Sequence, residues 1–434
     1  MNDEFKVGNL SKIIDEIDLL SMFIENKDYS ELKSEYHTKN IWLNTAISIM
    51  RFNIWILCNI KIKLQYNDKQ NDVLMYAGTN NQLAVLLKIQ NTFLARKMQS
   101  VLLTNCKSKA PNVNEVIRIA ITPIEFLKFN YLLFKRRKQL IRFVKEGHNG
   151  LQRQFLKAQL YTLIFHKRIT SIKPKLVFMA NDHNPENRAL LRVAQLLRTK
   201  TAYVQHASVS DIFPPLEFDL AFLDGEISRE KYRIGHNEPG HSLRQKTYLS
   251  GNLRVHHRPT LETAKYIGIT INKLYSPEKL NEIVEELSKN GKSVLIRWHP
   301  GSSSKLKKFL QTEYLSEKVE FSDPQKENIN DFCNRCISVI GGNTGALLDV
   351  VISRTTAIYA PFLDHLLMTE DTYGFYKNRI VLRATNTSEI AILINEINLP
   401  KPSSVRRFSA SFRTSYEGQE DCFIVSKTIE VLNW

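Results

Sequence analysis

The stretches Arg297-Trp-His-Pro-Gly301 and Gly341-Gly-Asn-Thr-Gly-Ala-Leu-Leu-Asp349 decide the fold expected of this chain. Each follows a short apolar run, at residues 293–296 and 337–340 respectively. An apolar strand, then a polar loop, then a helix is how a parallel α/β sheet presents ligand-binding groups at the carboxyl ends of its strands. Two such strand ends indicate loops that serve one ligand.

The same pattern recurs upstream. Residues 73–77 and 99–104 are predicted strands on either side of a helical run over 83–93, which makes a βαβ unit. Four further strands each end in polar residues: 175–179 before Ala180-Asn-Asp-His183, 201–204 before Gln205-His-Ala-Ser208, 220–223 before Asp224-Gly225, and 247–250 before Gly251-Asn252. Downstream, residues 319–321 and 356–359 also have strand character.

The length of 434 residues exceeds one ordinary core and fits two domains. The predicted fold class is α/β, with two Rossmann-like doubly wound domains facing a cleft and an α-helical N-terminal extension. The expected boundaries are a helical extension over 1–70, a first Rossmann-like domain over 71–255, a linker over 256–276, a second Rossmann-like domain over 277–410, and a final helix within 411–434 that could cross back to the first domain.

The formal net charge of +16 favours an anionic partner: a nucleotide, an acidic glycan, a membrane surface or nucleic acid. The densest basic run, Lys135-Arg136-Arg137-Lys138, is either a solvated helix face or a patch for anionic lipid or a polyanionic acceptor. Nucleic acid is disfavoured, because the sequence has no zinc-finger spacing, no RNP-like aromatic motif and no helix-turn-helix pattern.

Neither an uninterrupted apolar run of about 18 residues nor a secretory signal is visible, so the expected location is cytoplasmic, with peripheral attachment to the inner membrane face as an option. The five scattered cysteines agree with a reducing compartment. Cys333-Asn-Arg-Cys336 lacks a second ligand pair nearby and is expected to be two buried thiols on a helix. No metal and no cofactor are predicted.

The order of these motifs resembles that of GT-B glycosyltransferases, and within them the bacterial surface-polysaccharide transferases that include sialyl-, polysialyl- and Kdo-transferases and the related polyol-phosphate polymerases. The resemblance covers about residues 175–361 and rests on Val204-Gln-His-Ala207, residues 219–225, Ser250-Gly-Asn252, His299-Pro300, and Gly341-Gly-Asn-Thr344 with Asp349. It implies transfer of a sugar from a nucleotide donor, with a CMP-linked acidic sugar such as sialic acid or Kdo preferred, to a bacterial surface or capsular glycan. Ala207 stands where relatives often have glycine.

The second domain is expected to hold the donor, because glycosyl transfer needs a site for the leaving phosphate. His299 could donate to a phosphate oxygen, and Pro300 would fix its loop. Gly341, Gly342, Asn343 and Thr344 precede a helix and could direct backbone N–H groups and a hydroxyl at an anion. Asp349 could bind the ribose. The alternative is that His299 caps a strand end and that Asn343 or Thr344 is an ordinary helix cap.

The first domain is expected to supply the base that deprotonates the acceptor hydroxyl. Asp182 and His206 are the candidates, since both follow predicted strands. Asp182 would need burial to raise its pKa, whereas His206 titrates near neutral pH. His183, Gln205 and Asp224 are assigned to acceptor binding. The alternative is that these loop residues only cap helices and turns.

Three other functions stay open at this point. One is polyol-phosphate (glycerophosphate) transfer, with His206 and His299 as the working pair. Another is epimerisation at C2 of a UDP-sugar, which needs no separate acceptor. The third is a non-catalytic basic scaffold on a membrane face, in which residues 135–138 matter and His299 does not. A metal is not implied, because no Asp-x-Asp triplet stands at a strand end.

Overall fold

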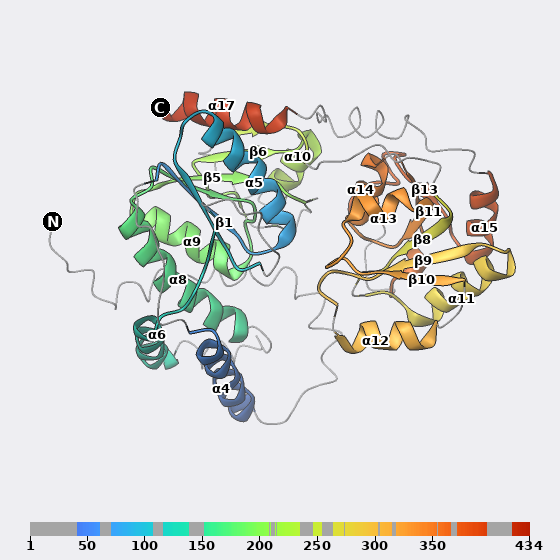
Figure 1. The fold of residues 1–434 in the computed structure, drawn as a ribbon, viewed down its shortest axis with the longest axis horizontal. Helices are drawn as coiled ribbons and strands as arrows, with labels where there is room; N and C mark the ends of the chain where they lie inside the picture. The colour runs from blue at the N-terminus through green and yellow to red at the C-terminus, as the bar shows by residue number, and fades with distance from the viewer. Residues whose placement is uncertain are drawn as a thin grey trace.

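The computed structural model contains two α/β domains, each built on a parallel sheet (Figure 1). It describes residues 41–60, 71–106, 116–138, 152–207, 209, 213, 215–234, 246–253, 264–272, 274–302, 304–314, 318–353, 355–365, 371–396 and 419–434. Within these ranges no helix has the length and apolar character that a membrane crossing requires.

The first domain has a seven-stranded sheet of order β3-β2-β1-β4-β5-β6-β7, with every neighbouring pair parallel. The strands are β1 (Val73–Ala77), β2 (Ser100–Thr104), β3 (Val116–Arg118), β4 (Leu176–Met179), β5 (Lys200–Val204), β6 (Leu220–Leu223) and β7 (Lys246–Leu249). The helices are α4 (Ile41–Cys58), α5 (Asn80–Ala95), α6 (Pro123–Lys135), α8 (Gln152–Ile172), α9 (Pro185–Leu196) and α10 (Glu226–Ile234). The strand order reverses between β1 and β4, and open α/β sheets bind ligands at such a point.

The second domain repeats this topology with six parallel strands of order β10-β9-β8-β11-β12-β13. The strands are β8 (Tyr266–Thr270), β9 (Ser293–Arg297), β10 (Val319–Ser322), β11 (Cys336–Gly341), β12 (Thr356–Tyr359) and β13 (Leu382–Arg383). The helices are α11 (Pro277–Lys289), α12 (Ser304–Glu313), α13 (Ile329–Asn334), α14 (Ala346–Ile352), the 3-10 turn η3 (Pro361–Leu363) and α15 (Thr387–Glu396). Its order reverses between β8 and β11.

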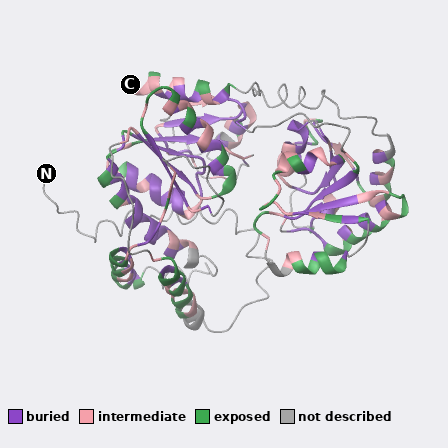
Figure 2. Ribbon diagram, viewed as in Figure 1, coloured by how far each residue is buried: buried purple, intermediate pink, exposed green. Residues whose placement is uncertain are grey.

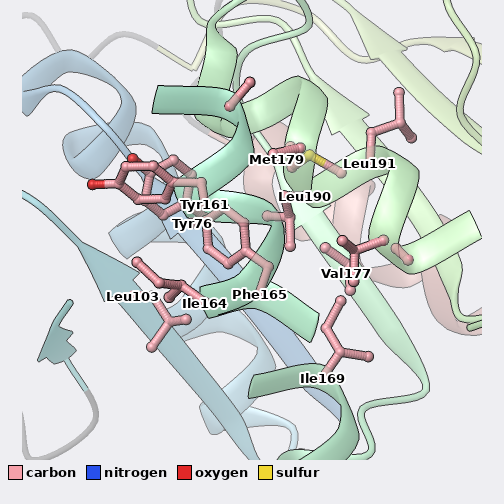
Figure 3. Packing of buried hydrophobic residues seen from close by; sticks show 14 of the residues in the cluster. Tyr76, Leu103, Tyr161, Ile164, Phe165, Ile169, Val177, Met179, Leu190 and Leu191 are labelled. Atoms are coloured by element: carbon pink, nitrogen blue, oxygen red, sulfur yellow. The ribbon is translucent and has the colours of Figure 1, made fainter. Parts of the chain in front are cut away.

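Buried apolar side chains cover both faces of each sheet (Figure 2). Every residue of β1, β4 and β6 is buried, as expected for parallel strands covered by helices on both sides. Figure 3 shows part of one face, where Phe165 of α8 meets Tyr76 of β1 edge-on with ring centroids 5.1 Å apart. The continuous apolar runs of the sequence therefore correspond to strands covered on both faces.

The predicted fold class, two Rossmann-like doubly wound domains, is confirmed. The predicted linker over 256–276 is wrong in its second part, because β8 lies there as a central strand of the second sheet. Gly268 interrupts the apolar run Tyr266-Ile-Gly-Ile-Thr270. Because glycine usually weakens a strand, the sequence did not indicate a strand there. Residues 1–40 and 61–70 of the predicted extension lie outside the described residues, and α4 is its described part.

The C-terminal helix α17 (Glu420–Leu432) lies beside α5 of the first domain (Figure 1). The Thr92 hydroxyl donates to the Asp421 carboxylate over 2.5 Å, and Arg96 donates to the Ser426 hydroxyl over 2.6 Å. The buried Ile424 and Val425 join the apolar cluster on that face of the sheet. The last described helix therefore packs on the first domain.

Gly268 yields a stability prediction, because a Cβ there would lie 2.7 Å from Cys336 Sγ and 2.8 Å from Phe332 Cζ. Gly268→Ala should lower the free energy of unfolding by about 1–3 kcal/mol, the usual cost of overpacking a core. Gly345→Ala is the matched control, since nothing lies within 4 Å of a Cβ built there. Chemical denaturation measures both. A Gly268→Ala midpoint equal to that of Gly345→Ala would contradict the close packing of β8 on α13.

Candidate active site

The segment 371–375 of the second domain contacts α10 of the first domain. From the first domain, Lys231 of α10 donates to the Thr372 carbonyl over 3.3 Å, and Ile227 packs with Tyr373 against an apolar cluster of the second domain. From the second domain, the Asn343 side-chain oxygen accepts the Thr372 N–H over 3.1 Å. Since α10 follows β6 and Asn343 follows β11, loops at both carboxyl edges border one region.

His183 and Asp182 form a hydrogen-bonded pair at the carboxyl end of β4. Asn181 fixes the turn, because its side-chain oxygen accepts the N–H groups of His183 and Asn184 over 3.0 and 2.7 Å. His183 Nδ1 lies 2.8 Å from Asp182 Oδ1. With Nδ1 engaged by Asp182, Nε2 is the other proton-exchanging atom of this imidazole, which is 6% exposed.

Hydrogen bonds from neighbouring side chains favour the ionised form of Asp182. The carboxyl group is 1% exposed, and burial alone would raise its pKa. The hydrogen bond and charge of His183, with a hydrogen bond of 2.7 Å from the Tyr232 hydroxyl, outweigh burial and hold the pKa of Asp182 below its ordinary value of 3.8. The expectation that burial raises the pKa of Asp182 is wrong, because the contacts with His183 and Tyr232 outweigh burial. The role of Asp182 as a base stays a prediction. Its geometry suits orienting His183.

A small pocket opens over the ends of β5, β6 and β7. Its lining comprises Val85, Gln205, His206, Ala207, Asp224, Asn252 and Leu253. Three motifs quoted from the sequence thus meet in one place, and the pocket includes the predicted His206.

Gln205 maintains the shape of this pocket. Its amide nitrogen donates to the Ala207 carbonyl over 2.9 Å and to the Ser228 hydroxyl over 3.0 Å. Its amide oxygen accepts the Asp224 N–H over 3.1 Å, and Ser228 donates to Asp224 Oδ1 over 2.6 Å. The amide of Gln205 is thus bonded within the pocket wall at both ends, and its expected role in acceptor binding stays a prediction.

Ser228 and Tyr232 are site residues that sequence reasoning missed. They stand four residues apart on one face of α10, where Ser228 contacts Asp224 and Tyr232 contacts Asp182. One helix therefore connects the loops after β4 and β6. No motif marks these residues, and only their spacing in an amphipathic helix could have suggested a shared face.

His299 lies at the carboxyl end of β9 in a turn closed by a 2.8 Å hydrogen bond from Ser302 N–H to the His299 carbonyl. Its Nδ1 accepts the Gly301 N–H over 3.0 Å. An imidazole that accepts at Nδ1 is neutral and carries its proton on Nε2. The half-buried imidazole of His299 thus presents an N–H donor of the kind expected for a phosphate oxygen, and the exposed Pro300 follows it in the turn.

Close packing explains why residues 341 and 342 are both glycine. A Cβ on Gly342 would collide with the Asp364 carboxylate, and one on Gly341 would lie 2.7 Å from Thr270 Oγ1. Asp364 Oδ2 accepts the Asn343 N–H over 2.5 Å, and Asp364 Oδ1 accepts from the Asn272 amide over 2.8 Å. The Asn343 N–H is therefore committed to Asp364, and anion binding at this loop stays a prediction. Thr344 Oγ1 accepts the Ala346 N–H over 3.3 Å at the start of α14.

Asp364 was not predicted, although it follows β12 as closely as the predicted residues follow their strands. Burial raises its pKa, and the hydrogen bonds from Asn343 and Asn272 only partly offset that. Asp349 lies on α14 within electrostatic range of Arg297 and Cys333. Its expected contact with a ribose stays a prediction.

Cys333 and Cys336 are two buried thiols, and burial raises the pKa of both. The expectation that both lie on a helix is wrong, because only Cys333 is on α13 and Cys336 begins β11. In the part of the chain that the structure describes, His, Cys, Asp and Glu side chains form no group of three that could hold a metal ion.

No family model and no curated protein matches the chain. Solved structures do. The MnaA protein of S. aureus with UDP aligns over 84% of this chain and 97% of its own, with TM-score 0.53 and 12% identity. The UDP-GlcNAc 2-epimerase of Methanocaldococcus jannaschii with UDP-GlcNAc and UDP aligns over 82% and 99%, with TM-score 0.52 and 15% identity. The Neisseria meningitidis UDP-GlcNAc 2-epimerase bound to UDP-GlcNAc aligns over 82% of this chain and 99% of its own, with TM-score 0.51 and 13% identity.

These likenesses establish the fold, which is the GT-B arrangement of two Rossmann-like domains. At such low identity they carry no residue roles. The resemblance to sialyl- and Kdo-transferases is not among them and stays a prediction.

The buried carboxylate gives a second stability prediction. Tyr232→Phe removes a donor to Asp182 Oδ2 and should cost about 1–3 kcal/mol of unfolding free energy at neutral pH. The pKa of Asp182 is lowered on folding, so its stabilisation is present above the unfolded-state pKa and is lost as the pH falls through the folded-state value. The difference between variant and wild type should therefore shrink below about pH 4.

Denaturation at several pH values measures this difference. Tyr376→Phe is the control, since that ring is 42% exposed on the second domain and its loss should change little. A constant difference across the acid range would contradict the assignment to the Asp182 charge.

Proposed function

We propose that the chain is a nucleotide-sugar-dependent glycosyltransferase in which His183, oriented by Asp182, is the general base and His299 binds the leaving phosphate. One observation carries this proposal: the His183–Asp182 pair ends a strand of one sheet, His299 ends a strand of the other, and the segment 371–375 joins the two carboxyl edges. Base and phosphate donor on opposite domains suit a reaction between an acceptor and a nucleotide donor.

The proposed chemistry follows from which ring nitrogen carries the proton in His183 and in His299. His183 Nε2 takes the proton of the acceptor hydroxyl as that oxygen attacks the sugar carbon, and the imidazolium so formed is stabilised by the ionised Asp182. The bond from the sugar to the nucleotide phosphate breaks, and negative charge grows on the phosphate oxygen. The Nε2–H of His299 is suited to stabilise that charge. Asp224 and His206 in the neighbouring pocket contribute to acceptor binding.

The donor is proposed to be a CMP-linked acidic sugar and the acceptor a bacterial surface or capsular glycan, on the strength of the motif order in residues 175–361. The second candidate is epimerisation at C2 of a UDP-sugar. It is favoured by the fold, because structures of UDP-GlcNAc 2-epimerases from two organisms align over almost their whole length. The two functions differ in nucleotide and in the need for an acceptor.

His299→Ala should weaken nucleotide binding by about tenfold or more, because it removes a hydrogen bond to a charged group. Calorimetric titration with CMP and with UDP on wild type and variant measures the effect and identifies the nucleotide. His166→Ala, on α8 and away from both sheet edges, is the matched control. Unchanged affinity of His299→Ala for a nucleotide that wild type binds would remove His299 from the donor site.

His183→Gln should lower kcat by about a hundredfold to ten-thousandfold, because the glutamine amide can still donate to Asp182 but cannot accept a proton. Nucleotide affinity should stay at the wild-type value, because the proposed donor site lies on the other domain. His206→Gln is the informative comparison and should act mainly on the KM for the acceptor. Product analysis with CMP-sialic acid, CMP-Kdo or UDP-GlcNAc, with and without a glycan acceptor, measures these effects. Loss of turnover in His206→Gln alone would reverse the roles. A C2 epimer of UDP-GlcNAc formed without acceptor would establish the second candidate.

A further inference from the structure

The first domain exposes a large apolar surface on α4 and α6, which lie side by side at the end of the domain that carries α8 (Figure 1). We call this surface the α4–α6 face. Its apolar members, all at least one-third exposed, are Met50, Ile54, Trp55 and Leu57 on α4 and Ile124, Leu127, Tyr131 and Phe134 on α6. Leu127 is 68% exposed, Ile124 63% and Phe134 62%. Figure 2 shows exposed residues along both helices.

Both helices are apolar on their inner side as well. Phe52 and Ile56 of α4 and Phe129 and Leu132 of α6 are buried, and the Phe52 and Phe129 rings lie 5.6 Å apart. A helix that is apolar all round normally has a covering on every side. The inner sides are covered by α8 and by each other, whereas the described part of the chain leaves the outer sides exposed. An exposed apolar surface of this size marks an interaction site.

Positive charge surrounds this face. Arg51, Lys128, Lys135, Arg137 and Lys138 are exposed, whereas Arg136 points inward and burial lowers its pKa to about 10. The predicted basic patch is therefore corrected to three of its four residues. Lys135 lies over the Tyr131 ring and Arg137 over the Phe134 ring, at 5.6 and 4.3 Å from the ring centres, so that cation and apolar surface are contiguous.

Negative charge is missing from the exposed side of these two helices. Across the described stretches 41–60 and 116–138 the only carboxylate is Glu125, which is 3% exposed. It belongs to the capping box with Thr122 and pairs with Lys167. An apolar, aromatic-rich surface with cations at its edge and no exposed carboxylate on either helix complements the interface of an anionic bilayer, where aromatic rings and aliphatic side chains enter the headgroup region and cations meet the lipid phosphates.

We propose that the α4–α6 face docks the first domain onto the surface of an anionic membrane, with both helices lying in the interface plane. A second copy of the chain fits less well, because a twofold interface would bring each cationic edge against its own image. The inference is independent of the proposed glycosyl transfer. Docking would also orient the first domain relative to the membrane. The helix α8 packs against α4 and α6, and it also packs against α9, whose first residue follows the loop that carries His183.

Flotation of the purified protein with phosphatidylcholine vesicles, with and without phosphatidylglycerol, tests the docking. Wild type should bind the phosphatidylglycerol vesicles, and added salt should weaken binding because the surface charge is screened. Leu127→Glu with Phe134→Glu should bind at least about tenfold more weakly. Phe309→Glu with Ile392→Glu is the matched control, since these side chains are 47% and 56% exposed on the second domain, and it should bind as wild type does.

Two further readouts separate docking from misfolding and from self-association. Lys135→Gln with Arg137→Gln should reduce both the binding and its salt dependence, with an unchanged unfolding midpoint. Trp55 should give a blue shift of tryptophan emission on the vesicles that is lost in Trp55→Phe. If Leu127→Glu/Phe134→Glu binds vesicles as well as wild type does, the proposal is overturned. It is also overturned if wild type is a dimer without lipid and this double variant is a monomer. Nucleotide affinity, measured on the same samples, tests the proposed transferase separately.

Discussion

A buried, ionised carboxylate organises the first domain around its carboxyl edge. Asp182 is almost inaccessible to water, so its charge depends on donors from the protein, and these are His183 beside it and Tyr232 from α10. Removing one donor from a buried charge costs more than the hydrogen bond itself, because the charge is left partly unsolvated. The position of α10 and the orientation of the His183 ring are thus both tied to this carboxylate.

The influence of α10 extends to the second domain. Its Ser228 completes the network of Gln205 and Asp224, while Ile227 and Lys231 contact the segment 371–375, which is bonded in turn to Asn343. A change at Asp182 would therefore reach the loops that carry the proposed donor site. The α4–α6 face lies on the other side of α8, so membrane contact and chemistry would use different surfaces of one domain.

Much of the fold could be predicted because its signals are short-range. Strands β1 and β12 coincide with runs of apolar residues, and polar or glycine residues mark where they end. Strand β8 could not be predicted in this way. Its Gly268 reads as a strand breaker until Cys336 and Phe332 are seen to fill the space that a side chain would need. Among the candidate site residues, the sequence indicated which loops matter but not what each side chain contacts.

The sequence by itself determined the α/β class, the doubly wound order of elements and the group of loops in which Asp182, His183, His206 and His299 lie, because these depend on patterns within a few residues of each strand end. Only the tertiary structure decided that Asp182 is ionised, that Gln205 braces a pocket wall, that Gly342 makes room for Asp364, and that Arg136 turns inward while its neighbours face solvent. The physical reason is common to all four. Protonation, burial and hydrogen-bond partners are set by groups distant along the chain, which folding alone brings together.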